Sequence, residues 1–129
     1  MTEKEISRFL KAFLDGEGAE WTEEDGVLRF RVRHGAALWE TACRAGKDEL
    51  LIYGSYPFRP RDGQSARAEC ERINRRLARG AMFLTEDGAI VYRCRAEMDD
   101  VYGARERLRA ALDYSAKAML QFWGQMSRL

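Results

Sequence analysis

Within the run of residues 27–33, apolar and charged side chains alternate without interruption from residue 28 to residue 33. The apolar positions are Leu28, Phe30 and Val32, and the charged positions are Arg29, Arg31 and Arg33. Successive side chains of a β-strand point to opposite faces of its sheet, so this pattern predicts a strand that is buried on one face and solvated on the other. Such a strand is typical of an antiparallel sheet that is covered on one face only.

Two further strand patterns follow at residues 37–44 and 49–55. Short turn sequences at 34–35 and 45–47 separate the three runs. Parallel strands need long crossover connections, so the short turns predict an antiparallel meander. The pattern leaves open whether Trp39 faces the helices or the other face of the sheet.

The segment before the meander has the apolar spacing of an amphipathic helix. Thr2 and Glu5 can form a capping box at its start. Gly16 offers a left-handed stop at its end. Trp21 is expected to begin a short edge strand that precedes the meander.

The second half of the chain contains two more helical patterns. The first covers about residues 64–79, and Gly80 follows it as a C-terminal cap. Asp99 or Asp100 is expected to cap the last helix, which runs to about residue 127.

A hairpin is expected between these two helices. Asp87-Gly88 is a strong two-residue turn signal between two strand patterns. The order of elements is therefore α-β-β-β-α-β-β-α, which predicts an α+β fold with one antiparallel sheet and helices packed mainly on one face. A chain of 129 residues without a long linker is expected to form a single domain over residues 1–129.

The composition argues against several classes of protein. A hydrophobic fraction of 46% and a charged fraction of 33% are typical of globular proteins, and a formal net charge of +1 gives no overall reason to expect nucleic acid. The charged N-terminal segment is unlike a signal peptide. No apolar run approaches the ~18 residues that span a bilayer. We therefore expect a cytoplasmic protein that does not contact a membrane.

No residue pattern indicates catalysis, a cofactor or a metal ion. Cys43, Cys70 and Cys94 are far apart and form no Cys-x-x-Cys pair, which argues against a disulfide framework and a zinc site. They are expected to be free thiols in the core. His34 is the only histidine and lies beside a turn glycine, without partners for a triad or a metal site. We predict that the protein is not an enzyme, and we assign no catalytic, cofactor-binding or metal-ligating residue.

Two sets of residues are candidates for binding. Arginines of one strand and of the second helix form a candidate anion-binding face that consists of Arg29, Arg31, Arg33, Arg72, Arg75 and Arg76. Aromatic residues and Met are enriched at interface cores. The candidate protein-binding or dimer contacts are accordingly Trp39, Tyr53, Trp123, Met126 and Leu129. The alternatives are a solvated surface for the first set and core packing for the second.

The C-terminal half resembles the YbjN family over about residues 66–122. The pieces that carry the resemblance are a helix that contains Ile73-Asn74, a short apolar strand after Gly80, an Asp87-Gly88 turn, the strand Ile90-Val91-Tyr92-Arg93 and a long final helix. The N-terminal half agrees in element order. The fold that this resemblance implies is shared with type III secretion chaperones.

The resemblance implies a class of function rather than an activity. Members of the YbjN family are described as bacterial sensory-transduction regulators without an agreed biochemical activity. Secretion chaperones are homodimers that bind extended segments of a partner protein. We therefore expect a non-enzymatic protein-binding or regulatory module that forms a homodimer. The alternatives are nucleic-acid or acidic-ligand binding through the arginines, and small-molecule binding between sheet and helices.

Overall fold

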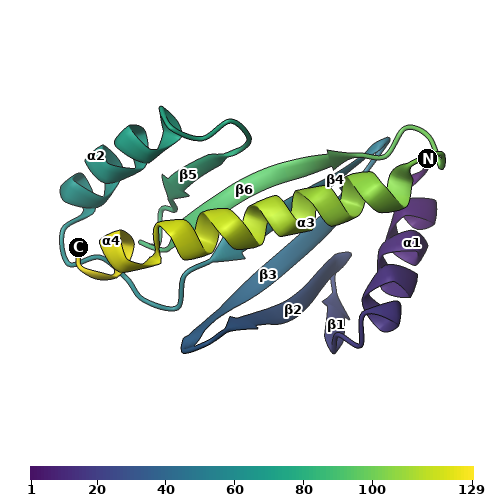
Figure 1. Ribbon diagram of the computed structural model, residues 1–129, viewed down its shortest axis with the longest axis horizontal. Coiled ribbons are helices and arrows are strands. Elements are labelled where there is room, and N and C mark those ends of the chain that lie inside the picture. The colour runs from purple at the N-terminus through teal and green to yellow at the C-terminus, as the bar shows by residue number, and fades with distance from the viewer.

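One antiparallel sheet of six strands organises the chain in the computed structural model, which describes residues 1–129 (Figure 1). The strands are β1 (Trp21–Glu24), β2 (Val27–His34), β3 (Ala37–Gly46), β4 (Glu49–Ser55), β5 (Ala81–Leu84) and β6 (Ile90–Glu97). The helices are α1 (Glu3–Gly16), α2 (Gly63–Asn74), α3 (Ala104–Gln121) and the short α4 (Trp123–Ser127).

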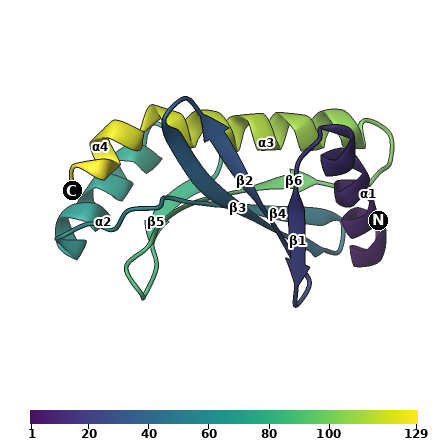
Figure 2. The same ribbon diagram turned by 90° about the horizontal axis from the view of Figure 1, so that it is seen from below.

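The helices cover one face of this sheet and leave the other uncovered (Figure 2). The strand order is β1-β2-β3-β4-β6-β5, and every neighbouring pair is antiparallel. Helix α3 packs against β4 and β6, α1 packs against β3, and α2 packs beside β5. The predicted α+β fold is therefore confirmed. No helix combines the length and the apolar character that crossing a bilayer requires.

The register of the strands explains which side chains form the core. Leu28, Cys43, Ile52 and Cys94 lie directly opposite one another across β2, β3, β4 and β6, and all four are buried. Trp39 lies on the same face and is only 2% exposed, which decides the orientation that the sequence left open. The alternation in β2 has the predicted effect, because its apolar residues face the helices and its arginines face solvent.

Helix α1 begins as expected but ends differently. The Thr2 hydroxyl accepts a hydrogen bond from the Glu5 N–H at 3.2 Å, and the Glu5 carboxylate accepts one from the Thr2 N–H at 3.4 Å. This is the predicted capping box. The left-handed residue after the helix is Gly18, with φ of +71°, and not Gly16, which is still helical.

Helix α2 ends at Asn74, earlier than the predicted residue 79. The Asn74 side chain turns out of the helix and pairs with the outer edge of β5. It accepts a hydrogen bond from the Met82 N–H at 2.7 Å and donates one to the Met82 carbonyl at 2.9 Å.

Gly80 is not the cap of α2 but a point of close approach between two chain segments. Its φ is +73°, and a Cβ atom on it would lie 2.3 Å from the Arg93 carbonyl oxygen. Only glycine allows the chain to pass this close to β6 as it enters β5.

The last helix begins at Ala104 and not at Asp99 or Asp100. The Arg107 guanidinium holds the preceding loop, because it donates to the carbonyls of Glu97 at 2.7 Å and Tyr102 at 2.7 Å and also to that of Asp100. These bonds keep the segment before Gly103 out of the helix.

The predicted single helix is also interrupted at Phe122, where α3 ends and α4 begins. After the interruption, Trp123 packs against three aromatic side chains, with ring centroids 6.2, 5.7 and 5.1 Å from those of Trp39, Tyr56 and Phe58.

Two of the predicted turns are shifted by a residue or two. Strand β3 extends to Gly46, and the turn to β4 has Asp48 in the left-handed region with φ of +58°. The hairpin between β5 and β6 closes where the Thr85 N–H donates to the Ala89 carbonyl at 2.8 Å. Its loop therefore contains three residues, Glu86 to Gly88, with the glycine in the left-handed region, and not the two-residue turn that Asp87-Gly88 predicts.

Candidate functional site

Four of the residues predicted to bind a ligand, namely Arg29, Arg31, Arg33 and Tyr53, lie on the face of the sheet that the helices leave uncovered (Figure 2). We call it the open face. It consists of the alternate residues of five strands that point away from the helices, namely Arg29, Arg31, Arg33, Leu38, Glu40, Ala42, Arg44, Glu49, Leu51, Tyr53, Ser55, Phe83, Val91, Arg93, Arg95 and Glu97.

The centre of the open face is apolar. Tyr53 lies directly opposite Ala42 on one side and Arg93 on the other. Leu51 lies one step along β4, opposite Arg44 and Arg95. Leu51, Tyr53 and Ala42 are all half-buried, so their side chains fill the middle of the face but keep part of their surface in contact with solvent.

Six arginines of the open face surround this apolar centre, and only two of them form ion pairs with a glutamate. Arg29 forms an ion pair with Glu40 at 3.0 Å, and Arg95 pairs with Glu49 and Glu97, both at 3.2 Å. The remaining four form no ion pair, namely Arg31, Arg33, Arg44 and Arg93. The open face is therefore a cationic surface with an apolar centre.

The residues of the candidate anion-binding face lie on two surfaces. Arg29, Arg31 and Arg33 are on the open face. Arg72 lies in α2, and Arg75 and Arg76 directly follow it. In this region Arg72 pairs with Glu69, and the Arg76 guanidinium lies 5.5 Å from the centre of the Phe122 ring. Helix α2 packs beside β5, which is at the far edge of the sheet from β2, so Arg72 and Arg76 do not share one compact surface with Arg29, Arg31 and Arg33.

The candidate protein contacts are divided in the same way. Trp39 and Met126 are 2% and 0% exposed, so they are core residues and are not accessible to a partner. Trp123 and Leu129 are half-buried and pack against the core near the C-terminus. Tyr53 alone of this set lies on the open face. The structure therefore excludes Trp39 and Met126 as partner contacts, and Tyr53, Trp123 and Leu129 stay predicted contacts.

The residues of the open face that the sequence did not point to include Arg44, Leu51, Arg93 and Arg95. The two arginines of β6 alternate with Tyr92, Cys94 and Ala96, which are buried. This is the same period of two that identified the arginines of β2, so the signal was present in the sequence.

The titratable residues that could carry chemistry do not converge. Burial raises the pKa of Cys43 to about 12 and that of Cys70 to about 11, and burial also raises the pKa of Cys94. All three thiols are therefore protonated at neutral pH and are poor nucleophiles. His34 is exposed at the turn between β2 and β3, and no three His, Cys, Asp or Glu side chains lie close enough together to hold a metal ion.

Comparison with known proteins finds a shared fold. No protein-family model matches the chain, and no curated protein matches it either. The crystal structure of YbjN from E. coli, described as a candidate transcription regulator, is similar with a TM-score of 0.68. The alignment covers 92% of this chain and 91% of that chain at 14% sequence identity. The resemblance to YbjN is therefore confirmed at the level of the fold.

Proposed function

We propose that the protein is a non-enzymatic regulatory module that binds an acidic partner protein on its open face. The observation that carries this proposal is the combination of a half-buried apolar centre, Leu51 and Tyr53, with four arginines that have no carboxylate partner. The similarity in fold to YbjN, a candidate regulator, supports a regulatory or binding module in general.

The residue types of the open face suit protein recognition. Tyr and Arg are enriched among the residues that carry most of the binding energy at interfaces. A partner that covers Leu51 and Tyr53 would remove their remaining apolar surface from water, which contributes about 25 cal/mol per Å². Unpaired arginines around an apolar centre raise the association rate with a negatively charged partner and disfavour a positively charged one.

Single-stranded nucleic acid is the second candidate ligand for the same face. Arg93 lies directly opposite Tyr53 in the sheet, and its guanidinium also lies 5.9 Å from the centre of the Phe83 ring. Aromatic rings and guanidinium planes are the groups on which unpaired bases stack. We favour the protein partner because Leu51 and Ala42, which are aliphatic and half-buried, occupy the centre of the open face and offer no ring on which a base can stack.

The test compares two double variants of the full chain. Tyr53→Ser with Arg44→Glu changes the open face, whereas Tyr102→Ser with Arg128→Glu makes the same chemical changes at exposed positions elsewhere, because Tyr102 is 84% exposed and Arg128 is also exposed. Proteins captured from the host by the wild type and identified by mass spectrometry would be purified and their affinities measured. We expect an acidic partner whose affinity falls at least tenfold for the open-face variant and less than twofold for the control.

Three results would count against the proposal. The first is a partner that binds both variants equally well. The second is a low-salt mobility shift with single-stranded DNA or RNA that the open-face variant abolishes, which would favour the second candidate. The third is turnover of a metabolite by the purified protein.

The cytoplasmic location and the homodimer are also parts of this proposal. A light-scattering mass near 14.9 kDa at micromolar concentration would contradict the dimer.

A further inference from the structure

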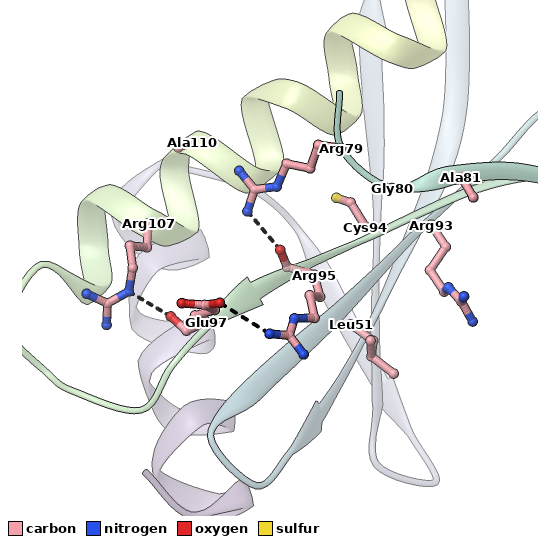
Figure 3. Close-up of a pocket in the computed structure, with 10 residues that line it drawn as sticks. All are labelled: Leu51, Arg79, Gly80, Ala81, Arg93, Cys94, Arg95, Glu97, Arg107 and Ala110. Atoms are coloured by element: carbon pink, nitrogen blue, oxygen red, sulfur yellow. Dashed lines mark hydrogen bonds and ion pairs between the residues drawn. The ribbon is translucent and has the colours of Figure 1, made fainter. Parts of the chain in front are cut away.

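The edge strand β5 is shorter than its neighbour, so it covers only half of β6. Ala81, the first residue of β5, lies opposite Arg93. The last four residues of β6, from Cys94 to Glu97, therefore pair with β4 on one side and have no strand on the other. A cleft of about 990 Å³ lies along this free edge, between β6 and α3 (Figure 3).

Four arginines line the cleft, together with a single carboxylate. The arginines are Arg79, Arg93, Arg95 and Arg107, and the carboxylate is that of Glu97. Glu97 is already engaged, because its side chain pairs with Arg95 at 3.2 Å. The guanidinium groups of Arg79 and Arg107 point at the backbone of β6 from the side of the helices, whereas Arg93 points away from them, toward the open face (Figure 3).

The acceptors on the free edge of β6 are occupied. Arg79 donates from Nη2 to the Arg95 carbonyl at 2.8 Å, and Arg107 donates from Nε to the Glu97 carbonyl at 2.7 Å. In an antiparallel strand the N–H and C=O of one residue point to the same side. The N–H groups of Arg95 and Glu97 therefore also point into the cleft, where no strand lies opposite them.

This arrangement determines what kind of ligand fits. A peptide that extends the sheet has to donate as well as accept hydrogen bonds, and the two edge carbonyls are no longer free to accept. The fully ionised phosphate of a monoester only accepts hydrogen bonds, and this edge offers it backbone N–H groups, the Arg79 guanidinium and the nearby positive charge of Arg107. Arginine and backbone N–H groups are the donors that bind phosphate in many proteins.

We propose that the cleft at the free edge of β6 binds the phosphate group of a small phosphorylated ligand. Arg79 and one backbone N–H group of the edge, that of Arg95 or that of Glu97, contact the oxyanion, and Arg107 positions the edge and contributes positive charge. The cleft is large enough for the organic part of such a ligand, because small-molecule sites are typically about 300–1,000 Å³. This site goes beyond the proposed function, since it lies at the edge of the sheet and does not need Tyr53 or Arg44.

Arg79, which contacts the oxyanion, and Arg107, which positions the edge, are both held in place before any ligand binds. The Arg79 carbonyl accepts a hydrogen bond from the buried Tyr92 hydroxyl at 2.6 Å, which fixes the backbone from which the Arg79 side chain extends. Arg107 is fixed by the three loop carbonyls that it bonds. A preorganised site loses little conformational entropy on binding, which favours affinity for a small ligand.

The test is a titration of the ¹⁵N-labelled full chain with inorganic phosphate, followed by two-dimensional NMR at constant ionic strength with chloride as the reference anion. We expect saturable shifts of the Arg95 and Glu97 amide signals. Arg79→Gln should weaken phosphate binding at least tenfold, and Arg79→Lys, which keeps the charge, should recover part of the loss. Arg128→Gln removes an exposed arginine of the C-terminal segment and should change the affinity less than twofold.

Each variant would first be checked for an unchanged amide spectrum away from the cleft, so that loss of folding is not mistaken for loss of binding. The proposal is overturned if the Arg95 and Glu97 amides do not shift, if Arg128→Gln weakens binding as much as Arg79→Gln does, or if acetate binds more tightly than phosphate. A phosphate monoester that binds at least tenfold more tightly than inorganic phosphate would support a small phosphorylated ligand over free phosphate.

Discussion

Replacing Gly80 by alanine should destabilise the protein far more than the same change at Gly18. The two glycines have nearly the same φ, +73° and +71°. Their surroundings differ. A Cβ atom on Gly18 would meet nothing within 4 Å, whereas one on Gly80 would lie 2.3 Å from the Arg93 carbonyl oxygen and 2.6 Å from the Tyr92 hydroxyl.

The expected magnitudes follow from these contacts. Placing an L-residue in the left-handed region costs about 1 kcal/mol, and this is all that Gly18→Ala should lose. An ordinary C···O contact is about 3.3 Å, so Gly80→Ala has to move the chain about 1 Å away from β6. That shift breaks the hydrogen bond from Tyr92 to the Arg79 carbonyl and weakens the pairing of Ala81 with Arg93, at about 1 kcal/mol each. The total loss for Gly80→Ala is therefore about 3 kcal/mol.

Urea unfolding monitored by circular dichroism gives the free energy of unfolding of both variants and of the wild type. For 129 residues the entropy of unfolding is about 0.27 kcal/mol/K, so the melting temperature should fall by about 4 °C for Gly18→Ala and about 11 °C for Gly80→Ala. Equal losses of stability in the two variants would refute the close approach of Gly80 to β6.

Two further predictions concern helix α2. Asn74→Ala removes both hydrogen bonds to the Met82 backbone and should lower the free energy of unfolding by about 2 kcal/mol, whereas a loss below about 0.5 kcal/mol in urea would show that water replaces them. Hydrogen bonds from Arg72 and Gln125 lower the pKa of Glu69 from its ordinary 4.5. Its contribution to stability is therefore present above about pH 4.5 and is lost as the pH falls through the folded-state pKa. Glu69→Gln should flatten the decline in stability between about pH 5 and pH 3, and parallel curves for variant and wild type would contradict this.

The parts of the fold that were predictable depend on neighbouring residues in the sequence. The alternation of Leu28, Phe30 and Val32 with arginines depends only on the geometry of a strand, and the structure has that strand at Val27–His34. The capping box of Thr2 and Glu5 joins residues three positions apart. Because these signals are local, they do not depend on where the element lies in the fold.

The helix ends that the sequence predicted wrongly are determined by contacts with residues distant in the sequence. Helix α2 stops where Asn74 can reach the Met82 backbone, and helix propensity alone favours its continuation. Asp99 and Asp100 have the composition of a helix start, but the bonds from Arg107 to the loop carbonyls override it. These contacts could not be inferred before the position of β5 and β6 was known.

The two candidate sites also differ in whether local sequence could predict them. The arginines of β2 could be placed on a solvated face from their period of two, and this is where they lie. The cleft could not be anticipated, because Arg79 comes from the loop after α2 and Arg107 from α3, and only the short β5 brings them to one edge. The separation of Arg72 and Arg76 from the strand arginines likewise follows from the position of α2 at the end of the sheet.

The insertion of β6 between β4 and β5 also affects how the chain is made. Strand β4 leaves the ribosome before residues 56–89, and its outer edge has no partner until β6 follows. During that interval, Leu50, Leu51 and Ile52 present unpaired backbone groups and apolar side chains that can pair with another copy of the chain. Refolding meets the same difficulty, since the hairpins close over short turns while the β4–β6 ladder must close a longer loop. The β4–β6 ladder is thus where folding competes with aggregation.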